Sequence, residues 1–400
     1  MNDLRHHFRT PLMRSPFHPR VEAANVLNAW APWAGVTTAL NFGDVAMEHS
    51  SIRNSASLYD ISPMIKYAIE GPGAAAYLDR LTLRRASALP VGAVQYTSWC
   101  NDAGHVLDDG TLFRLGEDRF RLCCQERHLP WLQDSAIGFD VSIRDETKAI
   151  AGLSLQGPTS FSVLSAAGGA DLASLKPFRL AEMHLGPAGP VMVSRTGFTG
   201  DLGYEIWTTP DRALDLWDHL MAAGTPHRLR PVGTEALNIA RIEAGFIIAN
   251  MDFICAEQVL RPDRARQPDE IGLGWMVDLD KGAFNGRNAI RAAREGGMLH
   301  WALVGLDIEG NVPAEGAELY LDGKKAVGQV TAAVWSPTTK RNLALAQIRR
   351  PWHRDAGDRL RAEIYALREL QYHKLMLRAR IARRPFFNPP RRRATPPGMF

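Results

Sequence analysis

Two neighbouring carboxylates, Asp108 and Asp109, follow a glycine turn within residues 101–110 and are the first candidates for chemistry in this sequence. Because successive residues of a strand point to opposite faces, only one of the two can face a given pocket. A carboxylate held in a pocket can act as a general acid or base, or can orient an amine. On the surface, the same segment would carry only solvated charges.

A glycine-rich segment, residues 194–207, places a further carboxylate, Glu205, between Tyr204 and Ile206 in a predicted strand. This pattern puts Glu205 either on the surface or in the interior with a partner. In the interior it requires hydrogen-bond donors, and a heterocycle with adjacent N–H groups would supply two. The glycines precede a strand and no Gly-Lys-Ser/Thr follows them, so the pattern excludes a phosphate-binding loop.

The third candidate is Arg241, near the end of a helix predicted over residues 234–244. Asn238 and Arg241 share one face of this helix because they are three residues apart. Gly245 suits the position after the helix end, where an arginine interacts favourably with the last carbonyl groups. Arg241 is thus either a structural charge at a helix end or a ligand-binding group.

The elements that must position these residues are mixed strands and helices without a regular βαβ rhythm, which predicts the α+β class. Residues 300–308 have the pattern of the first strand of a new domain, after a short polar stretch with two glycines. Short strands separated by turns follow it. This spacing predicts a small β-barrel of about 100 residues.

The length, charge and cysteine content of the chain argue against several classes of protein. Four hundred residues, 46% hydrophobic and 22% charged, predict two or three packed domains. The formal net charge of +4 comes from the two ends, because residues 21–377 carry −6 once the arginine-rich segments are subtracted. This argues against a nucleic-acid-binding fold. The four cysteines form no C-x-x-C pair and no apolar run could span a bilayer, so we expect a cytoplasmic protein without a metal site.

Taken in order, these segments and several others resemble the glycine-cleavage T-protein superfamily, along nearly the whole chain. Each fragment is weak alone, but their shared order is specific. The matching segments are residues 10–12 (TPL), Glu48 and His49, residues 59–62 (YDIS), 104–109 (GHVLDD), 156–158 (QGP), 196–200 (TGFTG), 203–206 (GYEI), 241–245 (RIEAG) and 336–337 (SP).

The resemblance implies a three-domain cloverleaf with tetrahydrofolate in a central channel. Residues 1–293 would form two interleaved α+β folate-binding subdomains, the second over roughly residues 55–145. Residues 294–400 would form the C-terminal β-barrel with a basic tail.

The resemblance also implies roles for single residues. Asp108 matches the catalytic carboxylate, and Glu205 matches the glutamate that binds the pterin edge. Tyr96, Tyr204 and Arg241 are expected beside the folate.

Departures from the family pattern concern the folate tail and the donor substrate. Leu237 stands where glycine-cleaving relatives have an arginine that reaches the folate carboxylate end. Arg383 and Arg384, near the end of the chain, are alternative cations for this tail. Asn250 and Asp252 partly replace a family motif, which indicates a changed wall around the donor.

We expect a tetrahydrofolate-dependent one-carbon transferase or demethylase that moves a methyl or aminomethyl group from a small donor to N5 of the folate. A methyl ether donor would need a general acid, for which His105 or His49 are candidates. One alternative is the glycine-cleavage aminomethyltransferase, with a lipoyl carrier protein as partner. Another is a folate-binding iron–sulfur accessory protein, against which Ala283 argues because those relatives have a cysteine there.

Overall fold

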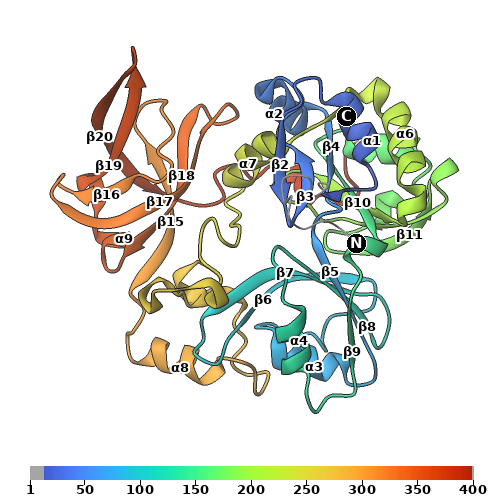
Figure 1. Ribbon diagram of the computed structural model, residues 1–400, viewed down its shortest axis with the longest axis horizontal. Helices are drawn as coiled ribbons and strands as arrows, with labels where there is room; N and C mark the ends of the chain where they lie inside the picture. Colours follow the sequence, from blue (N-terminus) through green and yellow to red (C-terminus); the bar gives the residue numbers. More distant parts are fainter. Residues whose placement is uncertain (1–12, 399–400) are drawn as a thin grey trace, which may run out of the picture.

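The computed structural model describes residues 13–398, and the predicted motif at residues 10–12 lies outside them. Three lobes surround a common centre, two built on open sheets and one on a closed barrel (Figure 1). The prediction of an α+β protein with a C-terminal β-barrel is confirmed. None of the described helices is long and apolar enough to cross a membrane.

The first lobe contains a six-stranded sheet in the order β11-β12-β13-β10-β4-β14. One face packs against helices α5 (Ser160–Ala166) and α6 (Ala213–Gly224) in a core that includes Leu153 and Ile206. The opposite face carries Glu205 and looks toward the second lobe. The strands are β4 (Ala56–Asp60), β10 (Ala151–Gln156), β11 (Leu180–His184), β12 (Pro190–Ser194), β13 (Gly203–Thr208) and β14 (Leu229–Pro231).

Short elements complete the first lobe around the start of the described chain. They include a three-stranded sheet in the order β1-β3-β2, whose central strand joins one parallel and one antiparallel neighbour. These elements are β1 (Met13–Arg14), α1 (His18–Ala24), β2 (Trp30–Trp33), β3 (Val36–Ala39) and α2 (Val45–Asn54).

The second lobe is a five-stranded antiparallel sheet in the order β6-β7-β8-β5-β9. Helices α3 (Ala74–Leu81) and α4 (Leu129–Ser135) cover one face, and α3 places Tyr77, Leu78 and Leu81 in the core at helical spacing. Strand β4 pairs in the first sheet, so the strands of the second lobe follow Asp60. Its strands are β5 (Ile65–Glu70), β6 (Ala93–Cys100), β7 (Val106–Arg114), β8 (Arg119–Cys124) and β9 (Ser142–Asp145).

The third lobe is a closed barrel in the order β15-β18-β17-β16-β19-β20. Its core is built from aliphatic side chains, which include Val304, Leu306 and Ile348. The strands and one short helix are β15 (Trp301–Ile308), β16 (Glu318–Leu321), β17 (Lys325–Ser336), β18 (Arg341–Arg349), α9 (Trp352–Asp355), β19 (Leu360–Arg368) and β20 (Gln371–Ala382).

Helix α7 and the segment after β20 connect the first lobe with the barrel. Helix α7 (Thr234–Glu243) packs against α2 and against β17. Helix α8 (Arg287–Glu295) comes directly before the barrel in the sequence. After β20 the chain returns to the first lobe, where the Arg391 guanidinium pairs with Asp201 at 2.6 Å. We name residues 383–398 the C-terminal strap. The predicted basic tail is therefore a packed segment at this point.

Candidate active site

The two adjacent aspartates of β7 point to opposite faces of the second sheet. In the pairing of β6 with β7, Ser98 lies opposite Asp109 and Trp99 lies opposite Asp108. Directly paired residues share a face, so Asp108 lies on the face of Trp99, which belongs to the core of the second lobe. Asp109 lies on the other face, together with Tyr96.

Asp108 is completely buried, and its carboxylate is occupied by neighbours. One oxygen accepts the Asp109 N–H at 2.8 Å, and the other accepts the Glu126 N–H at 3.0 Å. The second oxygen also lies 3.1 Å from Nε2 of His128, whose Nδ1 is 3.1 Å from the Glu257 carboxylate. The sequence offered no signal for this Asp108–His128–Glu257 chain, because its members are far apart.

The electrostatics of this chain favour a charged imidazole. Burial by itself lowers the pKa of His128, but the hydrogen bonds and negative charges of Asp108 and Glu257 outweigh burial and raise it. His128 Nε2 lies 3.1 Å from the Asp108 carboxylate, where a proton on the ring would compensate the buried negative charge. Asp108 therefore has a satisfied environment with no open side for a ligand.

Asp109 has the opposite character, because it is only partly buried and has one side-chain partner. Its Oδ2 accepts a hydrogen bond from the Tyr96 hydroxyl at 2.6 Å. Burial and the nearby negative charge of Asp108 raise the pKa of Asp109 to about 8. This carboxyl group can therefore gain or lose a proton near neutral pH, as general acid–base catalysis requires.

Glu205 lies on the sheet face of the first lobe that looks toward Asp109's face of the second lobe. The two faces meet where the Phe113 and Trp207 rings pack edge to face at 5.9 Å. Phe113 and Asp109 share one face of β7, and Trp207 and Glu205 share one face of β13, since each pair is separated by an even number of residues. The two carboxylates thus line facing surfaces.

Glu205 is 8% exposed, and its side-chain hydrogen bonds within the protein come from hydroxyl groups. Thr196 donates to Oε2 at 2.6 Å and is itself 2.8 Å from the Ser194 hydroxyl. Among the described residues, no cation forms an ion pair with Glu205, and burial raises its pKa to about 7. A buried acceptor of this kind is suited to a ligand that brings N–H donors.

Tyr204 does not belong to this site, which corrects the expectation from sequence. It is fully buried on the opposite face of β13, in the core of the first lobe beside Leu153 and Ile206. Strand alternation causes this, because Tyr204 is adjacent to Glu205.

Arg241 is fully buried, and it braces the segment after α7. Its Nη1 donates to Asp252 at 2.6 Å and its Nε to Asn238 at 2.8 Å, while Asp252 also accepts from Thr331 of the barrel at 2.6 Å. Arg241 Nη2 has no hydrogen-bond partner within residues 13–398. Arg241 and Asp252 therefore have a structural role here, and the two N–H groups of Arg241 Nη2 are left without a partner.

The other predicted substrate residues lie in turns. Asn250 is exposed, has a left-handed φ of 62° and accepts the Cys255 N–H at 3.0 Å. His105 is half-buried, and burial lowers its pKa. Neither has a recorded side-chain contact with Asp109. His49 is buried against Glu243 at 3.2 Å, within the network that joins the lobes.

The cations expected to hold a folate tail are differently placed. Arg384 donates to the carbonyl oxygens of Gly245 and Leu303 at 3.4 and 3.2 Å, and Arg383 is exposed on the strap. Leu237 packs against an apolar cluster between the first two lobes.

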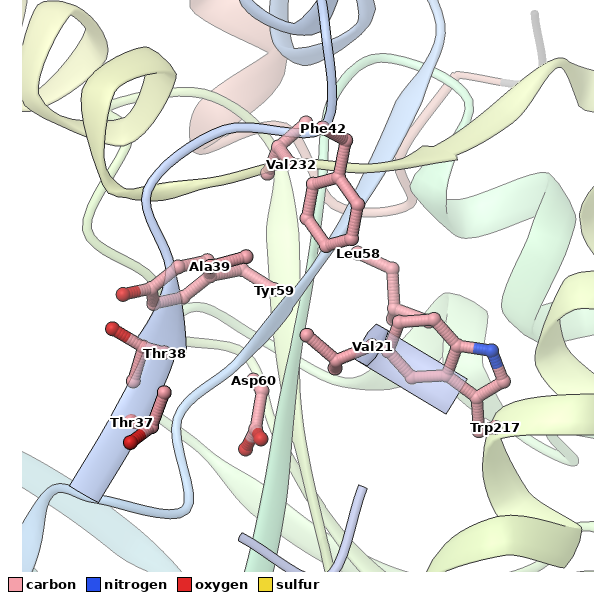
Figure 2. Close-up of a pocket in the computed structure, with 10 residues that line it drawn as sticks. All are labelled: Val21, Thr37, Thr38, Ala39, Phe42, Leu58, Tyr59, Asp60, Trp217 and Val232. Atoms are coloured by element: carbon pink, nitrogen blue, oxygen red, sulfur yellow. The ribbon is translucent and has the colours of Figure 1, made fainter. Parts of the chain in front are cut away.

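Two hollows in the described structure have volumes that suit ligands of very different size. The one in Figure 2, lined by Thr38, Asp60 and Trp217, has a volume of about 10 Å3, which is about one water molecule. The other, lined by Arg84, Gln95 and Trp275, measures about 550 Å3, within the range of small-molecule sites. The Trp275 ring lies 6.5 Å from that of Tyr96, so this hollow borders the candidate site.

Comparisons with known proteins agree with this architecture. A model described as the GCVT N-terminal domain matches residues 20–281, and one described as the glycine cleavage T-protein C-terminal barrel domain matches residues 302–388. A crystal structure of the glycine cleavage system aminomethyltransferase T from Bartonella henselae superposes with a TM-score of 0.81. It is 24% identical and covers 94% of this chain and 99% of its own.

Curated relatives carry two different names. An aminomethyltransferase of Bacillus subtilis is 31% identical over 89% of this chain and 94% of its own length. A trimethylamine-oxide aldolase of Ruegeria pomeroyi is 36% identical over 75% of this chain, which corresponds to only 38% of that protein. With both family models matched in order, the chain belongs to the glycine-cleavage T-protein family of transferase enzymes.

Proposed function

We propose that this protein is a tetrahydrofolate-dependent one-carbon transferase that moves a methyl or aminomethyl group from a small donor to N5 of the folate. The observation that carries the proposal is the pair of facing surfaces. One presents Glu205, a buried acceptor without a cation, and the other presents Asp109, a carboxyl group with a pKa of about 8.

The residues present fit a reduced folate. Glu205 would accept two N–H groups of the pterin, a pattern that rings without adjacent donors cannot match. Tyr96 and Asp109 would lie at the reacting amine. When bound, tetrahydrofolate supplies the secondary amine that accepts the one-carbon unit.

Asp109 rather than Asp108 is the carboxylate that we assign to contact the reacting amine. Forming the N5–C bond while the donor's bond to carbon breaks leaves one proton on N5, and the ionised Asp109 would accept it. Asp108 acts through Asp109, since its oxygens are held by two backbone N–H groups and His128. It is a positioning residue that also sets the pKa of its neighbour.

The donor is proposed to be a small methylated compound. The similarity to a protein named trimethylamine-oxide aldolase supports a methylated nitrogen group, although that relative is much longer. A methyl group on a cationic centre leaves readily, so no metal is needed in this scheme.

A second candidate is glycine-cleavage aminomethyl transfer, with a lipoyl carrier protein as partner. Curated relatives named aminomethyltransferase favour it. Leu237 argues against it, and so do Asn250 and Asp252, which only partly replace the family motif.

The product of a single assay separates these candidates. The protein would be incubated with tetrahydrofolate and either methylated amines or an aminomethyl-loaded carrier, and the folate product identified. We expect 5-methyl-tetrahydrofolate from the methyl donor. 5,10-Methylene-tetrahydrofolate and ammonia from the carrier would favour the second candidate, and the absence of folate binding would contradict both.

A further inference from the structure

The hollow beside Tyr96 is built from two arginines, a glutamine and a tryptophan. Arg84 and Arg85 follow α3, Gln95 belongs to the edge strand β6, and Trp275 comes from the segment before α8. Leu89 and Pro90 complete an apolar side. Such a mixture of flat apolar surface and cations suits a ligand with an aromatic part and carboxylates.

Of the two arginines in the hollow, Arg84 is the one that forms no ion pair with a carboxylate of the described residues. Its guanidinium lies 5.5 Å from the centre of the Trp275 ring, and Nη1 donates to the Tyr96 carbonyl at 3.0 Å. No carboxylate of residues 13–398 lies within ion-pair distance of it, and burial lowers its pKa. Arg85 is more exposed and lies 3.6 Å from Asp278, a carboxylate that also lines the hollow and leaves Arg84 as its uncompensated cation. An anion entering the hollow would therefore compensate a half-buried charge.

Gln95 gives an independent indication of a ligand. Its side chain is 7% exposed, yet its Nε2 has no hydrogen-bond partner among the described residues. A buried amide N–H without a partner is unfavourable, and a ligand carbonyl or carboxylate would satisfy it.

The position of the hollow connects it with the reaction centre. Gln95 points to the face of β6 opposite Tyr96 and Asp109, so the link is made by Trp275, whose ring lies 6.5 Å from the Tyr96 ring and 5.5 Å from the Arg84 guanidinium. At the position where glycine-cleaving relatives have an arginine, Leu237 carries no charge. Arg384 donates to the carbonyl oxygens of Gly245 and Leu303.

We propose that Arg84, Arg85 and Gln95 form a carboxylate subsite, and that its occupant is the aminobenzoyl-glutamate end of the folate. This inference rests on the proposed function. Each added glutamate of a polyglutamylated folate would bring a further carboxylate toward the two arginines. A carboxylate of the methyl donor is the other source of the same chemistry.

The test compares three ligands by isothermal titration calorimetry: 5-formyltetrahydrofolate, its pentaglutamate, and 6-methyltetrahydropterin, which lacks the tail. They are titrated into the wild type, the Arg84→Gln/Arg85→Gln variant and the control Arg368→Gln, which removes an exposed arginine of β19 in the barrel. We expect the double variant to bind the pentaglutamate about tenfold or more weakly, since two charge-assisted contacts are lost. The double variant should bind the tail-less pterin as the wild type does, and Arg368→Gln should bind all three ligands as the wild type does.

Other results would overturn the assignment. Equal losses for the pentaglutamate and the tail-less pterin would show a general disturbance of the site. Unchanged folate binding together with a raised KM for a carboxylate-bearing donor would assign the hollow to the donor. If Glu205→Gln abolishes pterin binding while the double variant binds the pentaglutamate normally, the subsite fails and the proposed function stands.

A Gln95→Leu variant gives a second measurement that does not alter charge. We expect it to weaken 5-formyltetrahydrofolate without changing the dependence of affinity on glutamate number. If this variant binds every ligand as the wild type does, Gln95 is not part of the subsite and the proposal fails in that part.

Discussion

The carboxylates of two regions of this protein have opposite surroundings. At the facing sheet surfaces, Asp109 and Glu205 have hydroxyl partners and raised pKa values of about 8 and 7. Where α2, α7 and the barrel meet, Glu243 accepts from Arg53 at 2.8 Å, from Ser336 at 2.5 Å and lies 3.2 Å from His49. Burial opposes ionisation of Glu243, but the His49 hydrogen bond and the Arg53 charge outweigh it and lower its pKa to about 2.

This difference in compensating partners distinguishes carboxylates with a structural role from carboxylates that could act on a ligand. A carboxylate that the protein itself compensates holds lobes together, whereas one left uncompensated is available to a ligand or a proton. Replacing members of the two groups should therefore affect different measurements.

The largest expected effect is on turnover, from Asp109→Asn. Loss of the proton acceptor should lower kcat by about 10²–10⁴-fold. The melting temperature at pH 8 should not fall, because the variant removes a carboxylate that is poorly compensated. A lowered melting temperature with normal turnover would reverse the comparison between the two regions.

Glu243→Gln should show the reverse pattern. Leaving Arg53 buried without its carboxylate should destabilise the protein by about 3–5 kcal/mol, measured by urea unfolding. Turnover of the folded fraction should remain near that of the wild type. A stability equal to the wild type would remove Glu243 from the structural group.

The pH dependence of stability sharpens the same contrast. The stabilisation from Glu243 is present above its ordinary pKa of 4.5 and is lost as the pH falls toward 2. Melting temperatures between pH 5 and 2 should fall more steeply for the wild type than for Glu243→Gln. Parallel curves would mean that other groups dominate acid unfolding.

Glu205→Gln should weaken folate binding by about 10–100-fold, because a neutral amide cannot accept two N–H groups equally well. In the wild type, affinity should decrease as the pH falls below about 7, where Glu205 becomes protonated. The variant should show no such dependence. Calorimetric titrations from pH 5.5 to 8.5 check both statements.

The smallest effect is expected from Asp108→Asn. Removing this negative charge should lower the pKa of Asp109, so the rising limb of kcat against pH should move to lower pH. Turnover above that limb should change less than in Asp109→Asn. If Asp108→Asn abolishes turnover at every pH while Asp109→Asn is active, the resemblance-based assignment of Asp108 is the right one.

The sequence predicted the fold class and the barrel, because strand alternation and turns are local patterns. It also indicated that only one of Asp108 and Asp109 faces a pocket. Which one does so depends on the pairing with β6, which shifts between Trp99 and Cys100 and cannot be read from β7 alone. Contacts such as those of His128 with Glu257 or Arg384 with Leu303 join distant segments, so no local pattern predicted them.

The C-terminal strap has a consequence for the order in which the molecule can assemble during synthesis. Arg391 donates to the Arg53 carbonyl, 338 residues earlier, and pairs with Asp201, whose side chain is fully buried. Within the first lobe, Asp201 pairs with Arg53 at the longer distance of 3.5 Å, and its second arginine partner, Arg391, is synthesised long after this lobe has left the ribosome. Contacts of such long sequence separation form late. The barrel lies between the first lobe and the strap in the sequence. The contacts of the strap with the first lobe can therefore form only after the barrel has been synthesised.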